Sequence, residues 1–209
     1  MGSTYKICAT IAEVIAKGVF WFRAYGTENI PHEGGCLIAM NHESYLDPPL
    51  AGISAPRELF FLARKTLLKW PVVGRILPSL NVIPVDQDRA DMSALKTVIK
   101  QIRAGHGTVI FPEGSRSPDG TLQPAQPGAG LVIAKTRCPV IPARIFGAHE
   151  AFPRGGTPRP FRPIKIVFEP PMEFAESDFA GKGRELYQRL SDRVMERIAK
   201  IQPPNGSRS

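Results

Sequence analysis

A histidine and an aspartate stand five positions apart in the run Asn41-His42-Glu43-Ser44-Tyr45-Leu46-Asp47. The residues before it, 36–40, are apolar and follow two glycines, a pattern typical of a short buried strand. Asp47 is followed by two prolines, which favours a helix start with the aspartate as its N-cap. We therefore expect the carboxylate to fold back onto the imidazole of His42. A histidine oriented by a carboxylate can act as a general base toward a hydroxyl group.

A second group of polar residues also follows an apolar run, at 108–110, and reads Phe111-Pro112-Glu113-Gly114-Ser115-Arg116-Ser117. Taken alone, Asp47 is more often a plain helix cap, and a single histidine is more often a packed or surface residue. Two strand ends that both carry such groups favour one site at the carboxyl edge of a sheet. Open α/β sheets bind their ligands at that edge.

Together the two groups resemble the motifs of the glycerolipid acyltransferase family, of which the 1-acyl-glycerol-3-phosphate acyltransferases are the best-known members. The family pattern is Asn-His, four residues and Asp, then Phe-Pro-Glu-Gly-(Thr/Ser)-Arg-Ser, and both motifs are complete here. Residues 82–87 resemble the family's Ile-Pro-Val-Asp-Arg block, although Gln87 stands where arginine is usual. Residues 139–145 fit its later Val-Pro-Val-type strand. The four blocks, in order, cover roughly residues 25 to 170.

The resemblance implies an enzyme that moves a fatty acyl group from an acyl-CoA or acyl-carrier-protein thioester to the free hydroxyl of 1-acyl-glycerol-3-phosphate, giving phosphatidic acid. His42 would be the general base, with Asp47 orienting it. Arg116 would hold the acceptor's phosphate, because a guanidinium matches phosphate oxygens in a two-pronged fork. An ion pair of Arg116 with Glu113 that only shapes the turn is the alternative. The other expected substrate-binding residues are Asn41, Lys65, Gln87, Arg89, Glu113, Gly114, Ser115 and Pro142.

The identity of the acceptor stays open, because Gln87 carries no charge and Arg89 would have to replace the missing cation. Lysophosphatidic acid, another lysophospholipid and a lysolipid without a terminal phosphate all fit. A non-catalytic lipid-binding or thioester-binding module and a soluble thioester hydrolase are alternatives of a different class. No cofactor or metal is expected, since Leu46 stands where a zinc-binding His-Glu-x-x-His motif needs its second histidine.

The composition is that of one ordinary globular domain, with 209 residues, 43% of them hydrophobic and 22% charged. The net charge of +8 favours anionic partners such as acidic lipid or a phosphorylated substrate. We expect no nucleic-acid binding, because no helix-turn-helix, zinc-finger spacing or RNA-binding aromatic motif is present. Three cysteines in apolar surroundings indicate reduced core residues, typical of a cytosolic environment.

Apolar runs alternate with amphipathic segments, which predicts an α/β fold with a mostly parallel central sheet flanked by helices. Expected strands lie at 36–40, 58–62, 81–84, 108–111, 140–146 and 164–168. Expected helices lie at 4–23, 48–54, 130–136 and 182–201, with one more that Asp91 caps. The domain plan is an N-terminal helix at 1–24, an acyltransferase domain at 25–203 and a disordered tail at 204–209. Three arginines, Arg189, Arg193 and Arg197, are expected to form a solvated helix face.

Residues 4–23 carry only a narrow polar stripe and are otherwise mostly apolar. Such a helix is either packed in a protein core or sunk in a membrane interface, and Glu13 and Lys17 count against a spanning helix. The resemblance favours the membrane, so we expect peripheral or monotopic association with its cytoplasmic face. Residues 64–77 mix cations with large apolar groups and suit an anionic membrane surface. A pair of short core helices is the alternative there.

Overall fold

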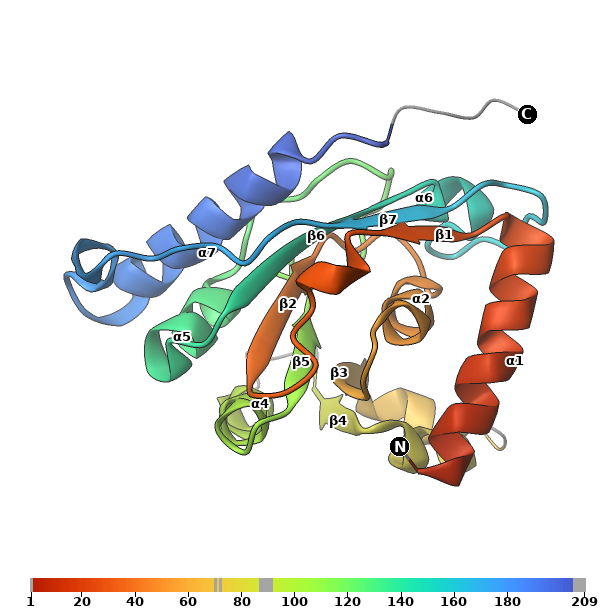
Figure 1. Ribbon diagram of the computed structural model, residues 1–209, viewed down its shortest axis with the longest axis horizontal. Coiled ribbons are helices and arrows are strands. Elements are labelled where there is room, and N and C mark those ends of the chain that lie inside the picture. Colours follow the sequence, from red (N-terminus) through yellow and green to blue (C-terminus); the bar gives the residue numbers. More distant parts are fainter. Residues whose placement is uncertain (1, 70, 72, 87–91, 205–209) are drawn as a thin grey trace.

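The computed structural model describes residues 2–69, 71, 73–86 and 92–204. Its centre is a seven-stranded sheet of order β1-β7-β6-β2-β5-β3-β4, with helices on both of its faces (Figure 1). Every strand pairing is parallel except that of β6 with β7. The predicted α/β fold, a mostly parallel sheet flanked by helices, is confirmed.

The strands are β1 (Arg23–Tyr25), β2 (Cys36–Met40), β3 (Leu59–Arg64), β4 (Val82–Val85), β5 (Gly107–Ile110), β6 (Val140–Phe146) and β7 (Lys165–Phe168). The helices are α1 (Ser3–Phe20), α2 (Asp47–Ser54), α3 (Val73–Ile76), α4 (Met92–Arg103), α5 (Pro127–Thr136), α6 (Ala148–Ala151) and α7 (Gly183–Lys200). Each predicted strand is present within two residues at either end. The pattern missed β1 and α6, which are too short to show a hydrophobic period. Asp91, the expected cap of α4, lies outside the described residues.

The two central strands that lead into the motifs are buried along their whole length, as expected for parallel strands covered on both faces. In β2, Ile38 and Met40 point into a core shared with α1, α2 and α6. Leu37 and Ala39 point into the opposite core, which α4, α5 and α7 cover. Packing from both sides therefore fixes the strand end that carries His42.

Helix α1 is packed on one side and open on the other. Tyr5, Ala16 and Phe20 are buried, and the helix lies against α2. Packing in the protein core, one of the two alternatives for this helix, therefore accounts for this face only. On the other face four apolar side chains are at least half exposed: Ile7, Ile11, Val14 and Ile15. Within the described part of the chain, no helix has the length and apolar character needed to cross a membrane.

The segment expected at a membrane surface forms short helical turns, at Lys65–Lys69, Val73–Ile76 and Leu77–Leu80. Leu68 is exposed and Leu67 is half-buried. These turns lie between β3 and β4 at one end of the sheet.

The arginine row of α7 is more than a solvated face. Arg193 forms an ion pair with Asp178, and Arg189 donates to the carbonyl of Asp178 at 3.1 Å. Arg197 Nη2 lies 2.6 Å from Glu169 Oε2. The expected solvated face is present, because Arg189 and Arg197 are exposed and Arg193 is half-buried. The ion pairs were not expected, because their partners at 169–178 are distant in the sequence and periodicity does not place them.

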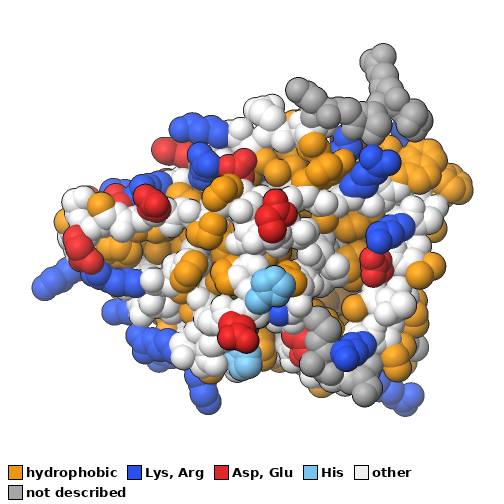
Figure 2. All heavy atoms as spheres, viewed as in Figure 1, with side chains coloured by type: hydrophobic (Ala, Val, Ile, Leu, Met, Phe, Trp, Pro, Cys, Tyr) orange, Lys and Arg blue, Asp and Glu red, His pale blue; other side chains and the backbone are white. Residues whose placement is uncertain are grey.

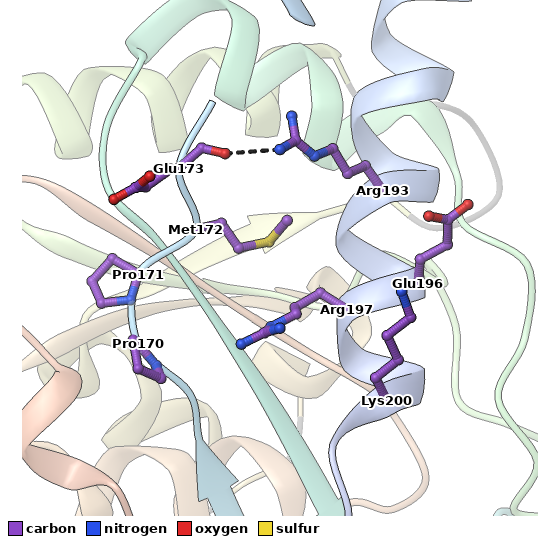
Figure 3. Close-up of a pocket in the computed structure, with 8 residues that line it drawn as sticks. All are labelled: Pro170, Pro171, Met172, Glu173, Arg193, Glu196, Arg197 and Lys200. Atoms are coloured by element: carbon purple, nitrogen blue, oxygen red, sulfur yellow. Dashed lines mark hydrogen bonds between the residues drawn. The ribbon is translucent and has the colours of Figure 1, made fainter. Parts of the chain in front are cut away.

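These contacts border a cavity of about 380 Å³ between α7 and the chain at 170–173 (Figure 3). Arg193 donates to the carbonyl oxygen of Glu173 at 2.9 Å across it. The charges of Arg193 and Arg197 are thus already satisfied within the protein. We interpret this cavity as a packing feature that holds the 169–178 segment on α7.

Helices α5 and α7 cross at Gly130, and this contact yields a first prediction. A Cβ at Gly130 would lie 1.8 Å from the carbonyl oxygen of Tyr187. Gly130→Ala should therefore lower the free energy of unfolding by about 1–3 kcal/mol through overpacking. Urea denaturation measures the change. Gly18→Ala is the control, because nothing lies within 4 Å of that position and alanine favours a helix. Equal stability of Gly130→Ala and wild type would contradict this account of the crossing.

Candidate active site

His42 follows the end of β2, and Asp47 is the first residue of α2. His42 Nδ1 lies 2.7 Å from Asp47 Oδ2. The backbone N–H groups of Glu43 and Ser44 donate to the same oxygen, at 2.6 and 2.8 Å. Asp47 is fully buried, whereas His42 is partly exposed. A carboxylate at Nδ1 favours the tautomer with the proton on that nitrogen, which leaves Nε2 as the basic atom.

Asp47 does not cap α2 in the manner expected. An N-cap side chain bonds to N–H groups that follow it, whereas this carboxylate bonds to residues that precede it. The N-cap position belongs to Leu46, and no side chain caps the helix. The reason lies in Pro48 and Pro49, which have no N–H to be capped. The carboxylate is therefore available to the loop and to His42.

Asn41 fastens this loop to β6. Its amide oxygen accepts from the backbone N–H of Ile145 at 2.8 Å. Its amide nitrogen donates to the carbonyl of Ile145 at 3.2 Å and to Glu43 Oε1 at 2.9 Å. Asn41 is fully buried and its polar atoms are engaged, so it holds the loop in position, and its expected contact with substrate stays a prediction.

The second motif lies against the first, as the two strand ends suggested. Strand β5 runs parallel to β2, and the ring of Phe111 stacks on the imidazole of His42 with centroids 3.9 Å apart. The backbone N–H of Ser117 donates to the carbonyl of His42 at 2.7 Å. The Glu113 carboxyl group accepts hydrogen bonds from the backbone N–H groups of His42 and Gln123. Glu113 thus ties the two loops together.

Two further carboxyl groups surround Asp47. Burial, reinforced by the charge of Asp47, raises the pKa of Glu43 to about 8. Burial also raises the pKa of Glu113 to about 8, although its two backbone hydrogen bonds oppose this change. Both groups are then largely protonated at neutral pH, and Asp47 is the anion beside the imidazole. Sequence reasoning missed Glu43, whose only signal is an acid next to the motif histidine, directly after a buried strand.

Arg116 takes a position that neither expectation described. Its guanidinium carbon lies 3.5 Å from the centroid of the Tyr45 ring, a cation–π geometry. No ion pair joins it to Glu113, although the structure describes both residues. Its Nη1 is buried and has no hydrogen-bond partner among the described atoms. Arg116 is therefore held by an aromatic face and keeps donor capacity for a ligand.

A cavity of about 740 Å³ lies beside His42. Three residues of the second motif, Glu113, Gly114 and Ser115, line it together with His42. Gly114 has φ +74°, a left-handed conformation that favours glycine. The cavity extends between the sheet and the starts of α4, α5 and α7, and its apolar walls include Leu62, Val85, Leu95, Ile110, Phe111 and Leu131.

The other predicted site residues lie elsewhere. Pro142 is buried within β6, where it pairs in register with Ala39, and it is not among the residues lining the cavity. Its expected role in substrate binding stays a prediction. Lys65 lies on the surface, in the turn after β3. Gln87 and Arg89 lie outside the described residues.

Comparison with known proteins supplies the family. A family model described as acyltransferase matches residues 22–146. The chain belongs to the acyltransferase family. Across 95% of its length it is 27% identical to the 1-acyl-sn-glycerol-3-phosphate acyltransferase of Bacillus subtilis, covering 96% of that protein. The enzyme of that name from Pseudomonas aeruginosa is 31% identical, over 87% of this chain and 70% of its own.

A solved structure shares the fold of this acyltransferase. The crystal structure of the 1-acyl-sn-glycerophosphate (LPA) acyltransferase PlsC from Thermotoga maritima superposes with a TM-score of 0.69 and 24% sequence identity. The match covers 96% of this chain and 81% of that one. The family resemblance drawn from the motifs is thus confirmed.

The carboxyl cluster predicts a pH dependence of stability. The pKa of Glu43 rises from an ordinary 4.5 to about 8, so between these values the folded state holds a proton that the unfolded state has lost. Stability should then fall as pH rises through this window, by up to about 1.4 kcal/mol per pH unit. Glu43→Gln, which does not ionise, should have a shallower slope in urea unfolding measured from pH 5 to 8. The exposed Glu196→Gln is the control. If Glu43→Gln kept the wild-type slope, the assignment of a raised pKa would be wrong.

Proposed function

We propose that this acyltransferase moves a fatty acyl group from an acyl-CoA or acyl-carrier-protein thioester to the free hydroxyl of 1-acyl-glycerol-3-phosphate, giving phosphatidic acid. The observation that carries the proposal is the His42–Asp47 pair beside a largely apolar cavity. The names of the Bacillus and Pseudomonas relatives support the choice of acceptor.

The reaction needs a base for the acceptor's hydroxyl. With Nδ1 bonded to Asp47, Nε2 of His42 takes the hydroxyl proton as the oxygen attacks the thioester carbonyl carbon. The tetrahedral intermediate then collapses by breaking the carbon–sulfur bond, and the imidazolium returns its proton to the departing thiolate. Asp47 stabilises the imidazolium, and because two backbone N–H groups hold its carboxylate, little reorganisation is needed.

The cavity suits the fatty chain. Its volume of about 740 Å³ falls within the range of about 300–1,000 Å³ that is typical of small-molecule sites. Burial of the fatty chain against apolar walls makes the free energy of binding more favourable. The same walls keep water away from the thioester. Because His42 lies at the cavity, a chain bound there has its thioester end within reach of the base.

The acceptor's phosphate fits the Arg116 side of the loop. Contact with the face of the Tyr45 ring restricts the orientation of the Arg116 guanidinium. Its unpartnered Nη1 can donate to a phosphate oxygen. Arg116 does not line the apolar cavity. The polar head and the fatty chain therefore bind on different sides of His42.

An acceptor panel tests the proposal. Labelled oleoyl thioester, as CoA or carrier-protein conjugate, is incubated with lysophosphatidic acid, other lysophospholipids and monoacylglycerol, and products are identified by mass spectrometry. Phosphatidic acid should dominate. His42→Ala and Asp47→Asn should lower kcat by about 10²-fold or more, because a positioned base contributes about 10²–10⁴ in rate. The exposed His32→Ala is the control.

Each contrary result of the panel rejects a different part of the proposal. Equal rates with all acceptors would reject the phosphorylated substrate. Full-rate release of free fatty acid without an acceptor would indicate a hydrolase. Unaltered transfer by His42→Ala would reject the general base.

We further propose that the enzyme works at the cytoplasmic face of a membrane, as a peripheral or monotopic protein. The open face of α1 supports this, and Figure 2 shows apolar side chains along the edge of the molecule that α1 forms. Beyond the end of the helix, Trp21 and Phe161 are both more than half exposed, with ring centroids 6.1 Å apart. Aromatic and aliphatic groups exposed on one surface are typical of an interfacial helix.

Replacing Ile7, Ile11 and Val14 together with glutamine should release the protein from vesicles. These side chains are exposed, and glutamine is a good helix former, so the thermal midpoint should change little. Membrane burial of each side chain contributes roughly 1.5–3 kcal/mol at most. Co-sedimentation with anionic vesicles should therefore weaken at least tenfold. Thr10→Gln, on the polar stripe, is the control. Unchanged sedimentation of the triple variant would show that α1 is not the contact surface.

A further inference from the structure

We propose that Arg154 supplies a second cation for the acceptor's phosphate, beside Arg116. The inference deepens the proposed function and rests on it. A phosphomonoester carries about −1.5 to −2 charges at neutral pH. One guanidinium therefore leaves it incompletely neutralised. Sequence reasoning looked for the second cation at Lys65 and Arg89, whereas Arg154 is the arginine that the structure places against Arg116.

The two arginines are in direct contact. Arg154 Nη1 donates to the backbone carbonyl of Arg116 at 3.3 Å. Arg154 is exposed, and neither arginine has a carboxylate within 4 Å in the part of the chain that the structure describes. Both side chains are cationic and have no carboxylate partner among those residues, so both charges are available to an anion bound where Arg154 meets the Arg116 backbone. The pair is therefore complementary to a dianionic group.

The loop that holds the base also holds Arg154. Ser44 Oγ donates to the carbonyl of Phe152 at 2.8 Å, two residues before Arg154. The centroid of the Phe152 ring lies 5.3 Å from that of Tyr45, and the Tyr45 ring also contacts the Arg116 guanidinium. Ser44 in turn donates its backbone N–H to Asp47. Arg154, Arg116 and the His42–Asp47 pair are thus fixed to one another through the loop at 41–47.

The geometry also indicates a role for Tyr45. Its ring contacts both the Arg116 guanidinium and the ring of Phe152. It therefore connects the elements that carry the two cations. We assign Tyr45 as a positioning residue, because it touches both elements and would reach the phosphate only through them.

Steady-state kinetics of the full chain test the inference. Arg154→Gln should raise the KM for lysophosphatidic acid at least fivefold, with kcat changed less than twofold and the KM for oleoyl-CoA unchanged. Arg154→Lys, which keeps the charge, should recover most of the affinity. Arg116→Gln serves as the reference for loss of a phosphate contact. Arg162→Gln, an exposed arginine of the same surface loop, is the matched control and should resemble wild type.

A pH series separates a phosphate contact from a structural role. The second ionisation of a phosphomonoester has a pKa of about 6. The KM of Arg154→Gln divided by that of wild type should therefore increase from pH 5.5 to 7.5. The negative charge of the phosphate grows over this range, so the missing arginine costs the variant more affinity. Vesicle co-sedimentation, measured in parallel, should not differ between the variants.

Several outcomes would overturn the inference. They are a KM like that of wild type, an equal rise in Arg162→Gln, or a rise that follows weakened vesicle binding. If wild type itself acylates lysophosphatidic acid no better than unphosphorylated lysolipids, the proposed function fails together with this role. If wild type prefers lysophosphatidic acid and Arg154→Gln retains that preference and its KM, only the role of Arg154 fails.

Discussion

The site depends on one buried carboxylate. Removing Asp47 from water carries a desolvation cost of several kcal/mol unless hydrogen bonds replace the lost solvent. Two backbone N–H groups and the imidazole of His42 converge on a single oxygen of Asp47 to replace it. Those bonds determine the path of the chain between β2 and α2. The path in turn orients Ser44 toward Phe152 and brings the ring of Tyr45 under Arg116.

The surrounding carboxyl groups add little further negative charge to that of Asp47. Burial and the proximity of Asp47 favour protonated Glu43 and Glu113, which would otherwise place like charges in one buried cluster. A neutral Glu113 can still accept the two backbone hydrogen bonds that join the loops. The imidazole therefore faces one anion on its Nδ1 side and an apolar ring, that of Phe111, on its face. These neighbours suit the general-base role that we propose for His42.

Much of the fold and the central pair could be predicted from the sequence, because short-range rules control them. A five-residue spacing after a buried strand, with two prolines behind it, leaves the loop few conformations, and the contact of His42 with Asp47 is present. The direction in which Asp47 bonds was not predictable from cap statistics, because the prolines remove the donors. The place of Pro142 inside a core strand was not predictable, because a motif marks family membership without saying which of its residues face a ligand. Arg154 and Glu43 were missed because their partners are distant in the sequence: Arg154 bonds to Arg116, 38 positions away, and Glu43 accepts from His149, 106 positions away.

The anchoring of Ser44 to Phe152 has a consequence for regioselectivity. One loop connects the arginines proposed to bind phosphate with Nε2 of His42, so in the proposed function the distance from the phosphorus atom to the base would be set by this loop. The 1-acyl and 2-acyl isomers of lysophosphatidic acid carry their one free hydroxyl at different distances from phosphorus, and only one of them would meet the imidazole. Lengthening or loosening the loop would then alter which isomer is acylated, even with every reacting group unchanged.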